Sequence, residues 1–367
     1  MILQSLSLTQ FRNFSSLDLA CTPGITLFLG DNAQGKSNLL EAIYFISTGR
    51  SFRTSKLSEL IRWGQAKFEV RCAVECRKVF HRIDAEVGAR QCRWLWDGKP
   101  RRGTSIFGHF KAVIFASEDL DVVRQEPATR RKFFDLFFSQ IDEEYGRHLD
   151  DYGKVVRSRN LLLREESYGE LGVWDELLIR EGSWLIWQRK RWLSAFEQTA
   201  TPHHTAVSAK GERMKLSYKT ACGQDANSQE DVAKALHAKI AEHAEHEKIL
   251  KTTLAGPHRD DYEISIDGRV VRHFGSEGQK RSAMLSLRLA QWKFLADISG
   301  EVPMILLDDV LGELDEERQT AFLDLVAQSG AQTFIALTQA RDSLLQKVGA
   351  MFEVSAGTLG VVNARTG

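Results

Sequence analysis

A glycine-rich segment that contains a lysine and a serine carries the clearest chemistry of this sequence. Residues 30–37 read Gly-Asp-Asn-Ala-Gln-Gly-Lys-Ser and fit the pattern G-x-x-x-x-G-K-[ST]. In such a loop, successive backbone N–H groups point inward at phosphate oxygens, and the following helix adds the positive end of its dipole. The pattern predicts a nucleotide triphosphate site, with Lys36 at the β- and γ-phosphates and the Ser37 hydroxyl on Mg²⁺. The residues predicted to bind the nucleotide are Gly30, Asp31, Asn32, Ala33, Gln34, Gly35, Lys36 and Ser37.

The residues on either side predict that this loop joins a strand to a helix. The apolar run Ile25–Leu29 comes directly before Gly30, and residues 38–44 read Asn-Leu-Leu-Glu-Ala-Ile-Tyr. A plain glycine turn ahead of a helix is the alternative interpretation. The strand, the loop and the helix follow in the order that a phosphate loop requires, and this order favours the phosphate site.

Two acidic residues end a second apolar run, far along the chain. Residues 304–309 read Met-Ile-Leu-Leu-Asp-Asp. A phosphate loop needs a carboxylate on a neighbouring strand to hold the metal, so we expect Asp308 to reach the Mg²⁺ shell. Asp309 is expected to orient or deprotonate the attacking water, which makes Asp309 and Lys36 the predicted catalytic residues. An ordinary strand followed by a helix cap would look the same in isolation. Together with the phosphate loop, the run favours a Walker B strand.

A further candidate phosphate contact precedes a long predicted helix. Residues 274–279 read Phe-Gly-Ser-Glu-Gly-Gln, which places small residues and a serine at the helix start. A helix N-terminus of this kind binds anions, and Ser276, Gly278 and Gln279 are the candidate contacts. One ATP needs only one phosphate loop, so these residues are not part of the first cradle. Taken alone, the segment is also typical of a flexible turn before an amphipathic helix.

Hydrophobic alternation and turn residues predict an α/β fold. We expect strands at residues 2–8, 25–29, 68–76, 80–87 and 93–96, and a hairpin turn at Asp97-Gly98. A second hairpin turn, Asp267-Gly268, is expected between strands at 262–266 and 270–274. Residues 279–296, 304–307, 316–327 and 333–337 then alternate helix, strand, helix and strand. This alternation predicts a parallel sheet that both ends of the chain share.

A helical region separates the two β-rich parts. From about residue 118 to 251 the apolar spacing becomes helical, and Pro127 stands where a proline in the first helical turn would be. We therefore expect an ATPase lobe made of residues 1–117 and 252–367. The mainly helical lobe would be residues 118–251.

Composition narrows the class of protein. Of 367 residues, 43% are hydrophobic, and no tract is long enough to cross a bilayer, so we expect a cytoplasmic location. The five cysteines form no clustered Cys/His set, which indicates neither a disulfide framework nor a zinc site. Because 49 basic and 49 acidic residues cancel, any contact with DNA must be local. Three basic clusters could be such contacts or ordinary solvated faces: Arg101, Arg102 and Lys111; Arg130, Arg131 and Lys132; and Arg189, Lys190 and Arg191.

Short motifs stand in order along nearly the whole chain. They are residues 11–14 (Phe-Arg-Asn-Phe), 38–42 (Asn-Leu-Leu-Glu-Ala), 49–53 (Gly-Arg-Ser-Phe-Arg), 117–120 (Ser-Glu-Asp-Leu) with Arg130-Arg131, 256–261 (Gly-Pro-His-Arg-Asp-Asp) and the segment at Ser276. Together with the phosphate loop, they resemble the RecF family of bacterial recombination mediators, which is related to the SMC proteins. The resemblance implies an ABC-type P-loop ATPase head, a mixed sheet around the phosphate-loop helix, with an inserted, mainly helical second lobe. It also makes residues 312–315 (Gly-Glu-Leu-Asp) similar to a D-loop.

For function, the resemblance implies an ATP-dependent DNA-binding protein of recombinational repair and replication restart. ATP with Mg²⁺ would close a homodimer on double-stranded DNA at gaps or single-strand/double-strand junctions. The helix start at Ser276 of one copy would contact the γ-phosphate held by the other. Weak, DNA-stimulated ATP hydrolysis would act as a switch that releases the DNA. RecO and RecR would be partners in loading recombinase, and the protein would be nucleoid-associated when on DNA and have no membrane partner.

The sequence departs from common ABC-type patterns at three places. Thr338-Gln339 stands where many of these ATPases have a switch histidine, Asp309 replaces a longer Glu, and Ser117-Glu118-Asp119 takes the place of a Q-loop glutamine. Other assignments stay open. Arg12 and Asn13 resemble nucleotide-side residues of SMC-like heads or build a β-turn, and His258 and Arg259 either build a turn or line the nucleotide site. DNA contacts are expected first near Arg50, Arg53, Arg101 and Arg102.

Two other classes of protein share the phosphate loop. A P-loop kinase or other metabolic phosphotransferase would use the helical lobe for its acceptor, but the segment at Ser276 would have no task in it. The nucleotide-binding subunit of a transporter would need a surface for membrane-domain helices, which fits the inserted lobe poorly. Stimulation of ATP hydrolysis by DNA, compared with small acceptors, separates the first hypothesis from the kinase.

Overall fold

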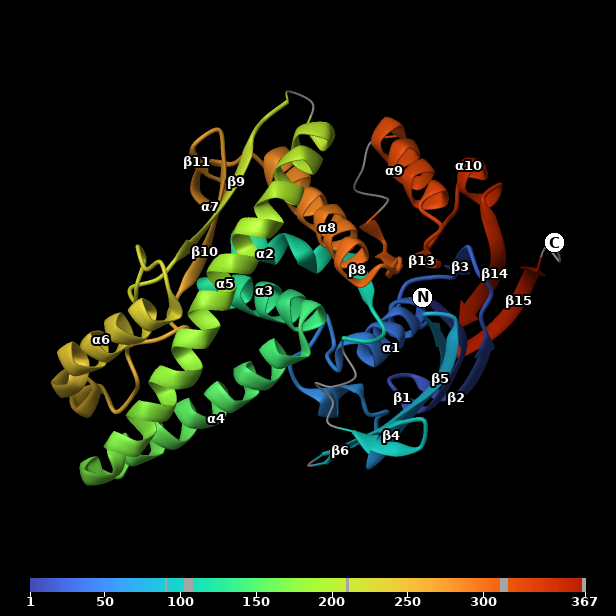
Figure 1. The fold of residues 1–367 in the computed structure, drawn as a ribbon. Coiled ribbons are helices and arrows are strands. Elements are labelled where there is room, and N and C mark those ends of the chain that lie inside the picture. Colours follow the sequence, from blue (N-terminus) through green and yellow to red (C-terminus); the bar gives the residue numbers. More distant parts are fainter. Residues whose placement is uncertain (90, 102–107, 209–210, 311–315, 365–367) are drawn as a thin grey trace. The chain divides into compact units, whose positions relative to one another are not determined.

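The computed structural model describes residues 1–89, 91–101, 108–208, 211–310 and 316–364, which fall into two compact units (Figure 1). The first unit combines Met1–Asp119 with Gln291–Gly367, and the second unit is Leu120–Ala290. The second unit is therefore an insertion in the sequence of the first. The helix α8 (Glu277–Ser299) contains the residue at which the chain passes from one to the other.

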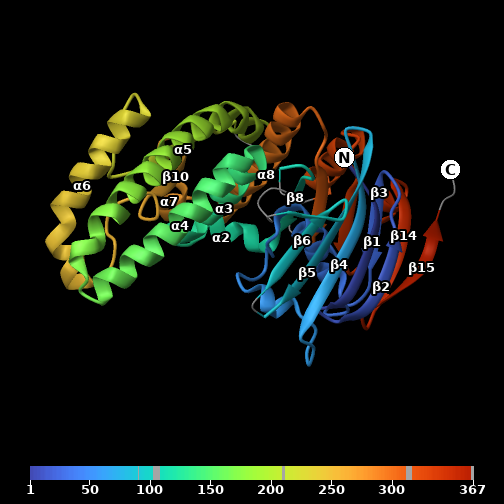
Figure 2. The same cartoon turned by 60° about the horizontal axis from the view of Figure 1, so that its bottom comes forward.

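An antiparallel sheet forms one layer of the first unit, with strand order β2-β1-β4-β5-β6-β7 (Figure 2). Its side chains alternate as the sequence predicted: Phe68 and Val70 are buried, whereas Glu69 and Arg71 lie on the outer face and pair at 2.7 Å. The sheet thus presents its apolar side to the interior of the unit. The strands are β1 (Ile2–Phe11), β2 (Phe14–Ala20), β4 (Lys67–Cys76), β5 (Val79–Gly88), β6 (Cys92–Trp96) and β7 (Lys99–Arg101).

A mixed sheet forms the second layer, with strand order β15-β14-β3-β13-β12-β8. All pairs from β14 to β8 are parallel, and only the edge strand β15 runs antiparallel. Strand β3, from the start of the chain, lies between two strands from its end, which confirms that both ends share one sheet. The strands are β3 (Ile25–Leu29), β8 (Ala112–Ala116), β12 (Met304–Asp308), β13 (Thr333–Leu337), β14 (Val348–Ser355) and β15 (Thr358–Ala364).

The helix α1 (Lys36–Thr48) packs between these two sheets. Its Phe45 ring lies 5.4 Å from Phe68 of β4 and 5.0 Å from Trp94 of β6, measured between ring centroids. Both faces of α1 are buried, and accordingly residues 39–46 are apolar apart from Glu41. The other helices among the described residues of this unit are the 3₁₀ turns η1 (Leu57–Leu60) and η3 (Ser117–Asp119), with α9 (Glu316–Gln328) and α10 (Asp342–Leu345).

The second unit is built from long helices around a small sheet. Pro127 occupies the first turn of α3, as predicted, because a helix needs no N–H donor there. The helices are α2 (Leu120–Arg124), α3 (Pro127–Ile141), α4 (Glu143–Arg164), η4 (Tyr168–Glu170), α5 (Leu171–Val207), α6 (Gln229–Leu250) and α7 (Val271–Phe274), with most of α8. The sheet has the order β11-β10-β9, from β9 (Met214–Lys219), β10 (Asp261–Ile266) and β11 (Arg269–Val270).

In each of two basic clusters of the sequence, one arginine is buried inside the second unit. Arg189 is 2% exposed and donates to both Asp135 carboxylate oxygens, at 2.8 and 2.9 Å, and to the Pro257 carbonyl at 2.7 Å. Arg130 is also buried, and its guanidinium donates to both Asp261 oxygens at 2.7 and 2.9 Å. A buried cation must be paired, so these arginines stabilise the helical unit and are not surface contacts for DNA.

The structure differs from the sequence predictions in this unit. Residues 252–290 belong to it, whereas we expected 252–367 to join the ATPase lobe, because β10 pairs along its whole length with β9. Strand β9 itself lies inside the region predicted to be helical. The strand expected at 270–274 is wrong: after two paired residues the backbone closes a helical turn, in which the Gly275 N–H donates to the Val271 carbonyl at 2.9 Å.

Within the described part of the chain, no helix combines the length and the apolar character needed to cross a bilayer.

Candidate nucleotide site

The carboxyl ends of four parallel strands meet at one edge of the mixed sheet. Leu29 of β3 is in register with Leu337 of β13, Ala336 with Asp308 of β12, and Asp308 with Ala116 of β8. The segments that follow these strands therefore begin side by side. They are the phosphate loop from Gly30, the pair Asp308-Asp309, the pair Thr338-Gln339 and the turn Ser117–Asp119. Ligands of parallel α/β sheets bind at this edge, so the predicted site has the expected place in the fold.

The loop between β3 and α1 has the backbone of an anion cradle. Gly30, Ala33 and Gly35 have φ angles of 152°, 64° and 124°, which curl the chain around the start of α1. No side chain caps α1 at Gly35, so the N–H groups of its first turn are available to an anion. A triphosphate would satisfy these donors.

The Lys36 ammonium closes the mouth of the loop. Its Nζ donates to the carbonyl oxygens of Gly30 at 2.8 Å and Asp31 at 2.7 Å, and the side chain is mostly buried. Burial lowers the pKa of Lys36, and the nearby charges of Asp309 and Asp308 act in the opposite direction. The ammonium can exchange its two carbonyl partners for phosphate oxygens without leaving its place.

Ser37 and Asp308 meet, although they lie far apart in the sequence. The Ser37 hydroxyl donates to Asp308 Oδ1 at 2.7 Å, and the Asp308 side chain is buried. Burial raises the pKa of Asp308 to about 6, against the lowering effect of this hydrogen bond. A divalent cation beside the carboxylate would stabilise its charged form.

The chemistry of these two groups fits Mg²⁺, and its binding there stays a prediction. The described residues contain no group of three or more His, Cys, Asp or Glu side chains that could enclose a metal ion. Mg²⁺ usually keeps several waters and takes one or two protein ligands together with phosphate oxygens, so the pair Ser37 and Asp308 is sufficient. Bound there, the ion would neutralise charge on the phosphate oxygens.

Asp309 lies next to this pair, at the same edge. Its N–H donates to the Ala336 carbonyl at 3.2 Å, and its backbone adopts a left-handed conformation with φ of 55°. The side chain is exposed, unlike that of Asp308. Aspartate is one of the few residues that tolerate this conformation, and here it lets β12 present one carboxylate to the interior and the next to solvent.

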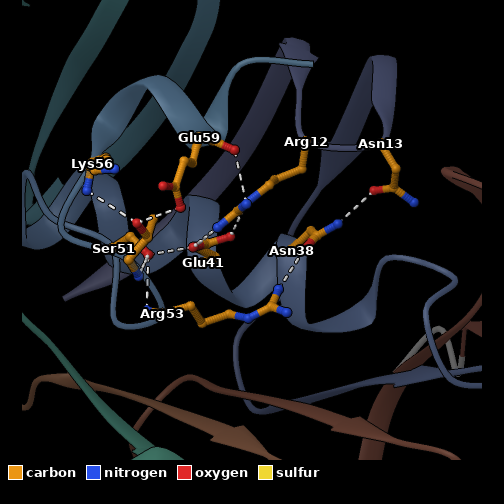
Figure 3. Close-up of polar contacts among 9 residues, drawn as sticks. Arg12, Asn13, Asn38, Glu41, Ser51, Arg53, Lys56 and Glu59 are labelled. Atoms are coloured by element: carbon orange, nitrogen blue, oxygen red, sulfur yellow. Dashed lines mark hydrogen bonds and ion pairs between the residues drawn. The ribbon is translucent and has the colours of Figure 1, made fainter. Parts of the chain in front are cut away.

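A polar network that the sequence did not predict connects α1 to neighbouring turns of the first unit (Figure 3). Glu41 is fully buried and accepts two hydrogen bonds of 2.8 Å from the Arg12 guanidinium and a further one from the Ser51 hydroxyl. This pair fixes α1 to the turn between β1 and β2. The one signal in the sequence is a glutamate inside the apolar run of residues 39–43.

The same network reaches the phosphate loop through Asn13. The Asn13 amide donates to the Gln34 carbonyl at 2.7 Å. The Asn13 side-chain oxygen accepts from Asn38 at 2.8 Å (Figure 3). Arg53 donates to Asn38 Oδ1 at 2.9 Å. Arg12 and Asn13 therefore form the turn that the sequence allowed, since Arg12 has a φ of 50°, and their side chains bond α1 and the phosphate loop. Their contact with a nucleotide stays a prediction.

The segment at Ser276 belongs to the second unit and forms a capping box at the start of α8. The Gln279 N–H donates to Ser276 Oγ at 3.2 Å, and the Ser276 N–H donates to Gln279 Oε1 at 2.9 Å. Ser276 and Gly278 are exposed, as is the preceding Phe274 at 72%. Because Ser276 Oγ accepts in this box, its O–H remains able to donate to a phosphate oxygen.

The other residues that the sequence suggested for nucleotide or DNA contacts either take part in hydrogen bonds within the protein or are exposed at its surface. His258 accepts at Nδ1 from the Tyr152 hydroxyl at 2.6 Å, and its Nε2 lies 3.1 Å from the Thr253 carbonyl. Burial lowers the pKa of His258 to about 4, so the ring is neutral. Arg259 donates to the same Thr253 carbonyl at 2.9 Å, and both residues thus form part of a turn. Arg50, Arg53, Arg101, Thr338 and Gln339 are exposed, Lys111 is buried, and Arg102 and residues 312–315 lie outside the described residues.

Comparison with known proteins gives matches over almost the whole chain. Residues 2–96 match the family described as RecF/RecN/SMC N terminal domain. The DNA replication and repair protein RecF of Symbiobacterium thermophilum is 36% identical over 368 residues, which cover 98% of this chain and 98% of that protein. RecF of Shouchella clausii is 35% identical over 370 residues, which cover 98% of this chain and 99% of its own.

Solved structures agree with these matches. A structure described as the recombination mediator protein RecF-ATPrS in the RecFOR pathway has a TM-score of 0.91 and 31% identity, and the match covers 99% of this chain and 98% of that one. A RecF-ATP structure from the same pathway also has a TM-score of 0.91 and 31% identity, over 98% and 97% of the two chains. An SMC head bound to the C-winged helix domain of ScpA is 17% identical, with a TM-score of 0.55 over 100% of this chain and 98% of that one, and shares the fold alone.

Proposed function

Because the chain belongs to the RecF family, we propose that it is an ATP-dependent DNA-binding protein of recombinational repair and replication restart. ATP would bind at the loop of residues 30–37, and two copies would close on double-stranded DNA at gaps or single-strand/double-strand junctions. Hydrolysis would be weak and stimulated by DNA, and it would release the complex. RecO and RecR are the proposed partners, in line with the RecFOR pathway of the similar solved structures.

The observation that supports this proposal is the presence of two different helix starts at which phosphate could bind. The start of α1 has open N–H groups with Lys36, Ser37 and Asp308 around them. The start of α8 is exposed and offers the Ser276 hydroxyl, beside an ion pair of Glu277 with Lys280 and without a phosphate loop of its own. Each is half of a nucleotide site, and a two-fold dimer would supply both halves twice.

Each residue at the site then has one proposed task. The loop N–H groups and Lys36 bind phosphate oxygens, and Ser37 with Asp308 would hold Mg²⁺, whose charge would stabilise the transferring phosphoryl group. Asp309 orients the attacking water from its exposed position. Ser276, Gly278 and Gln279 of the second copy bind the same phosphates from the other side. Closure therefore depends on the triphosphate, because its phosphates join the two halves of the site.

Contact with DNA is proposed for exposed arginines of the first unit. Arg50, Arg53 and Arg101 are candidates, but Arg53 also donates to Asn38 beside the phosphate loop. In each of two basic clusters, one arginine is buried in the second unit and is not available to DNA. The proposed contacts are local groups of cations, which agrees with a net charge of zero.

Binding to a gapped duplex should require ATP and should weaken steeply with salt. We expect affinity measured by fluorescence anisotropy to fall at least tenfold when ADP replaces ATP, since only the triphosphate joins the two half-sites. Between about 50 and 200 mM salt the affinity should fall by about 10³-fold if roughly six phosphates are contacted. A single strand of equal length is the control, and equal binding with ATP, ADP and no nucleotide would contradict the proposal.

A further inference from the structure

The hairpin of β14 and β15 lies against the phosphate loop in the first unit. Its turn, residues 355–358, is in contact with Gln34, which the motif G-x-x-x-x-G-K-[ST] leaves unspecified. The Ala356 N–H donates to Gln34 Oε1 at 2.7 Å, and the Gly357 N–H donates to the Gln34 carbonyl at 3.1 Å. Together with the bond from Asn13, three donors hold this one residue of the loop.

The fit between hairpin and loop leaves no space for an added methyl group. A Cβ on Gly30, at the start of the loop, would overlap the Val354 carbonyl oxygen of β14. A Cβ on Gly357 would lie 2.6 Å from the Asn13 carbonyl oxygen, and one on Gly35 would lie 2.8 Å from Asn13 Nδ2. Backbone therefore packs on backbone where Gly30 meets β14 and where Gly357 meets Asn13, whose side chain lies against Gly35 and bonds Gln34.

The turn itself has a conformation that its sequence does not favour. Ala356 and Gly357 have φ angles of 47° and 75°, which is a type I′ turn between Ser355 and Thr358. This turn favours Asn, Asp or Gly at its first central position, and alanine pays a steric cost there. The Thr358 hydroxyl, which donates to the Ser355 carbonyl at 2.6 Å, and the bond to Gln34 hold it in place.

We propose that the turn of the C-terminal hairpin, residues 355–358, is a positioning element of the phosphate loop and acts through Gln34. The inference rests on the proposed binding of ATP at this loop. Ala33, directly before Gln34, has a left-handed backbone with φ of 64°, so the loop conformation also needs support from outside. By fixing Gln34, the hairpin keeps the loop N–H groups directed at the phosphate position before the nucleotide arrives. Such preorganisation raises affinity because less order has to be gained on binding.

The variant Gly357→Ala tests this role, with Gly360→Ala as its matched control in the same hairpin. Gly360 has no left-handed φ, and a Cβ there would come no closer than 4.0 Å to the Glu353 carbonyl. In nucleotide-free protein we expect the amides of residues 31–36 to exchange hydrogen about tenfold faster in Gly357→Ala than in the control. The Kd for a fluorescent ATP analogue should rise about tenfold in parallel, which corresponds to 1.4 kcal/mol.

A second variant, Gln34→Ala, keeps the test valid if Gly357→Ala fails to fold. It removes the side-chain acceptor and creates no clash, and because the Ala356 N–H lies near the surface, water can replace the lost partner. Faster exchange at residues 31–36 with an unchanged thermal midpoint supports the positioning role. Wild-type exchange and Kd in folded Gly357→Ala or Gln34→Ala protein would overturn it. If wild-type protein does not bind the analogue, the proposed function fails, and the exchange rates without nucleotide still decide the role of the hairpin.

Discussion

Replacing Lys36 with alanine is expected to raise the Kd for ATP about a hundredfold while the chain stays folded. The Lys36 ammonium is mostly buried at the mouth of the loop, where its two carbonyl partners can be exchanged for phosphate oxygens. Losing charge-assisted hydrogen bonds to the β- and γ-phosphates removes about 3 kcal/mol, which is roughly a hundredfold in Kd. Titration with a fluorescent ATP analogue measures the change.

Lys293→Ala is the matched control for this substitution. Lys293 lies on α8 in the first unit, and its partly exposed ammonium pairs with Asp297. A surface pair of this kind contributes little to stability, so the control should bind ATP as the wild type does. Thermal unfolding of both variants verifies the fold. Binding of ATP by Lys36→Ala with the wild-type Kd would show that the loop of residues 30–37 is not the nucleotide site.

Replacing Ser276 with arginine is expected to abolish ATP-induced dimers and to leave binding of ATP by the single chain within about twofold of the wild type. Ser276 is exposed at the start of α8, where its hydroxyl oxygen and its N–H bond Gln279. In the proposed dimer a long side chain would fill the space of the partner's phosphates. Sedimentation velocity with ATP should therefore show the variant as a monomer under conditions in which the wild type is dimeric.

Ser276→Thr separates this effect from loss of the helix cap. Serine at an N-cap contributes about 1 kcal/mol to helix stability, and threonine retains both the cap and the hydroxyl donor. We therefore expect Ser276→Thr to form dimers with ATP, and the thermal midpoint shows how much stability Ser276→Arg has lost. Dimers of folded Ser276→Arg that match those of the wild type would rule out a phosphate contact from the second copy.

The sequence predicted two parts of the site: the phosphate loop, which is one continuous segment, and the carboxylate that a bound metal ion requires. The phosphate loop could be predicted because its strand, loop and helix are contiguous in the sequence. The structure has β3 and α1 at the expected residues. The need of Mg²⁺ for a carboxylate on a neighbouring strand pointed to Asp308, and its oxygen lies 2.7 Å from Ser37. The residues agree in position, and their roles in binding ATP remain predictions.

Contacts that depend on tertiary packing were not visible in the sequence. Strand β9 was missed because its six residues lie within a helical region and are stabilised by pairing with β10, far along the chain. In the sequence Arg189 belongs to a run of three basic residues that is typical of a surface, but its guanidinium is buried against Asp135. No pattern in the sequence indicates that the turn at Gly357 holds Gln34, because the two residues are brought together only by the pairing of β14 with β3.

Mixing the Lys36→Ala and Ser276→Arg variants tests the central claim most directly, namely that one copy caps the phosphates bound by another. A mixed dimer contains one complete site, formed by Lys36 of the Ser276→Arg chain and Ser276 of the Lys36→Ala chain. Sedimentation with ATP should show dimers in the equimolar mixture and monomers for each variant alone. Monomers in the mixture, or dimers of either variant by itself, would contradict a nucleotide site shared between two copies.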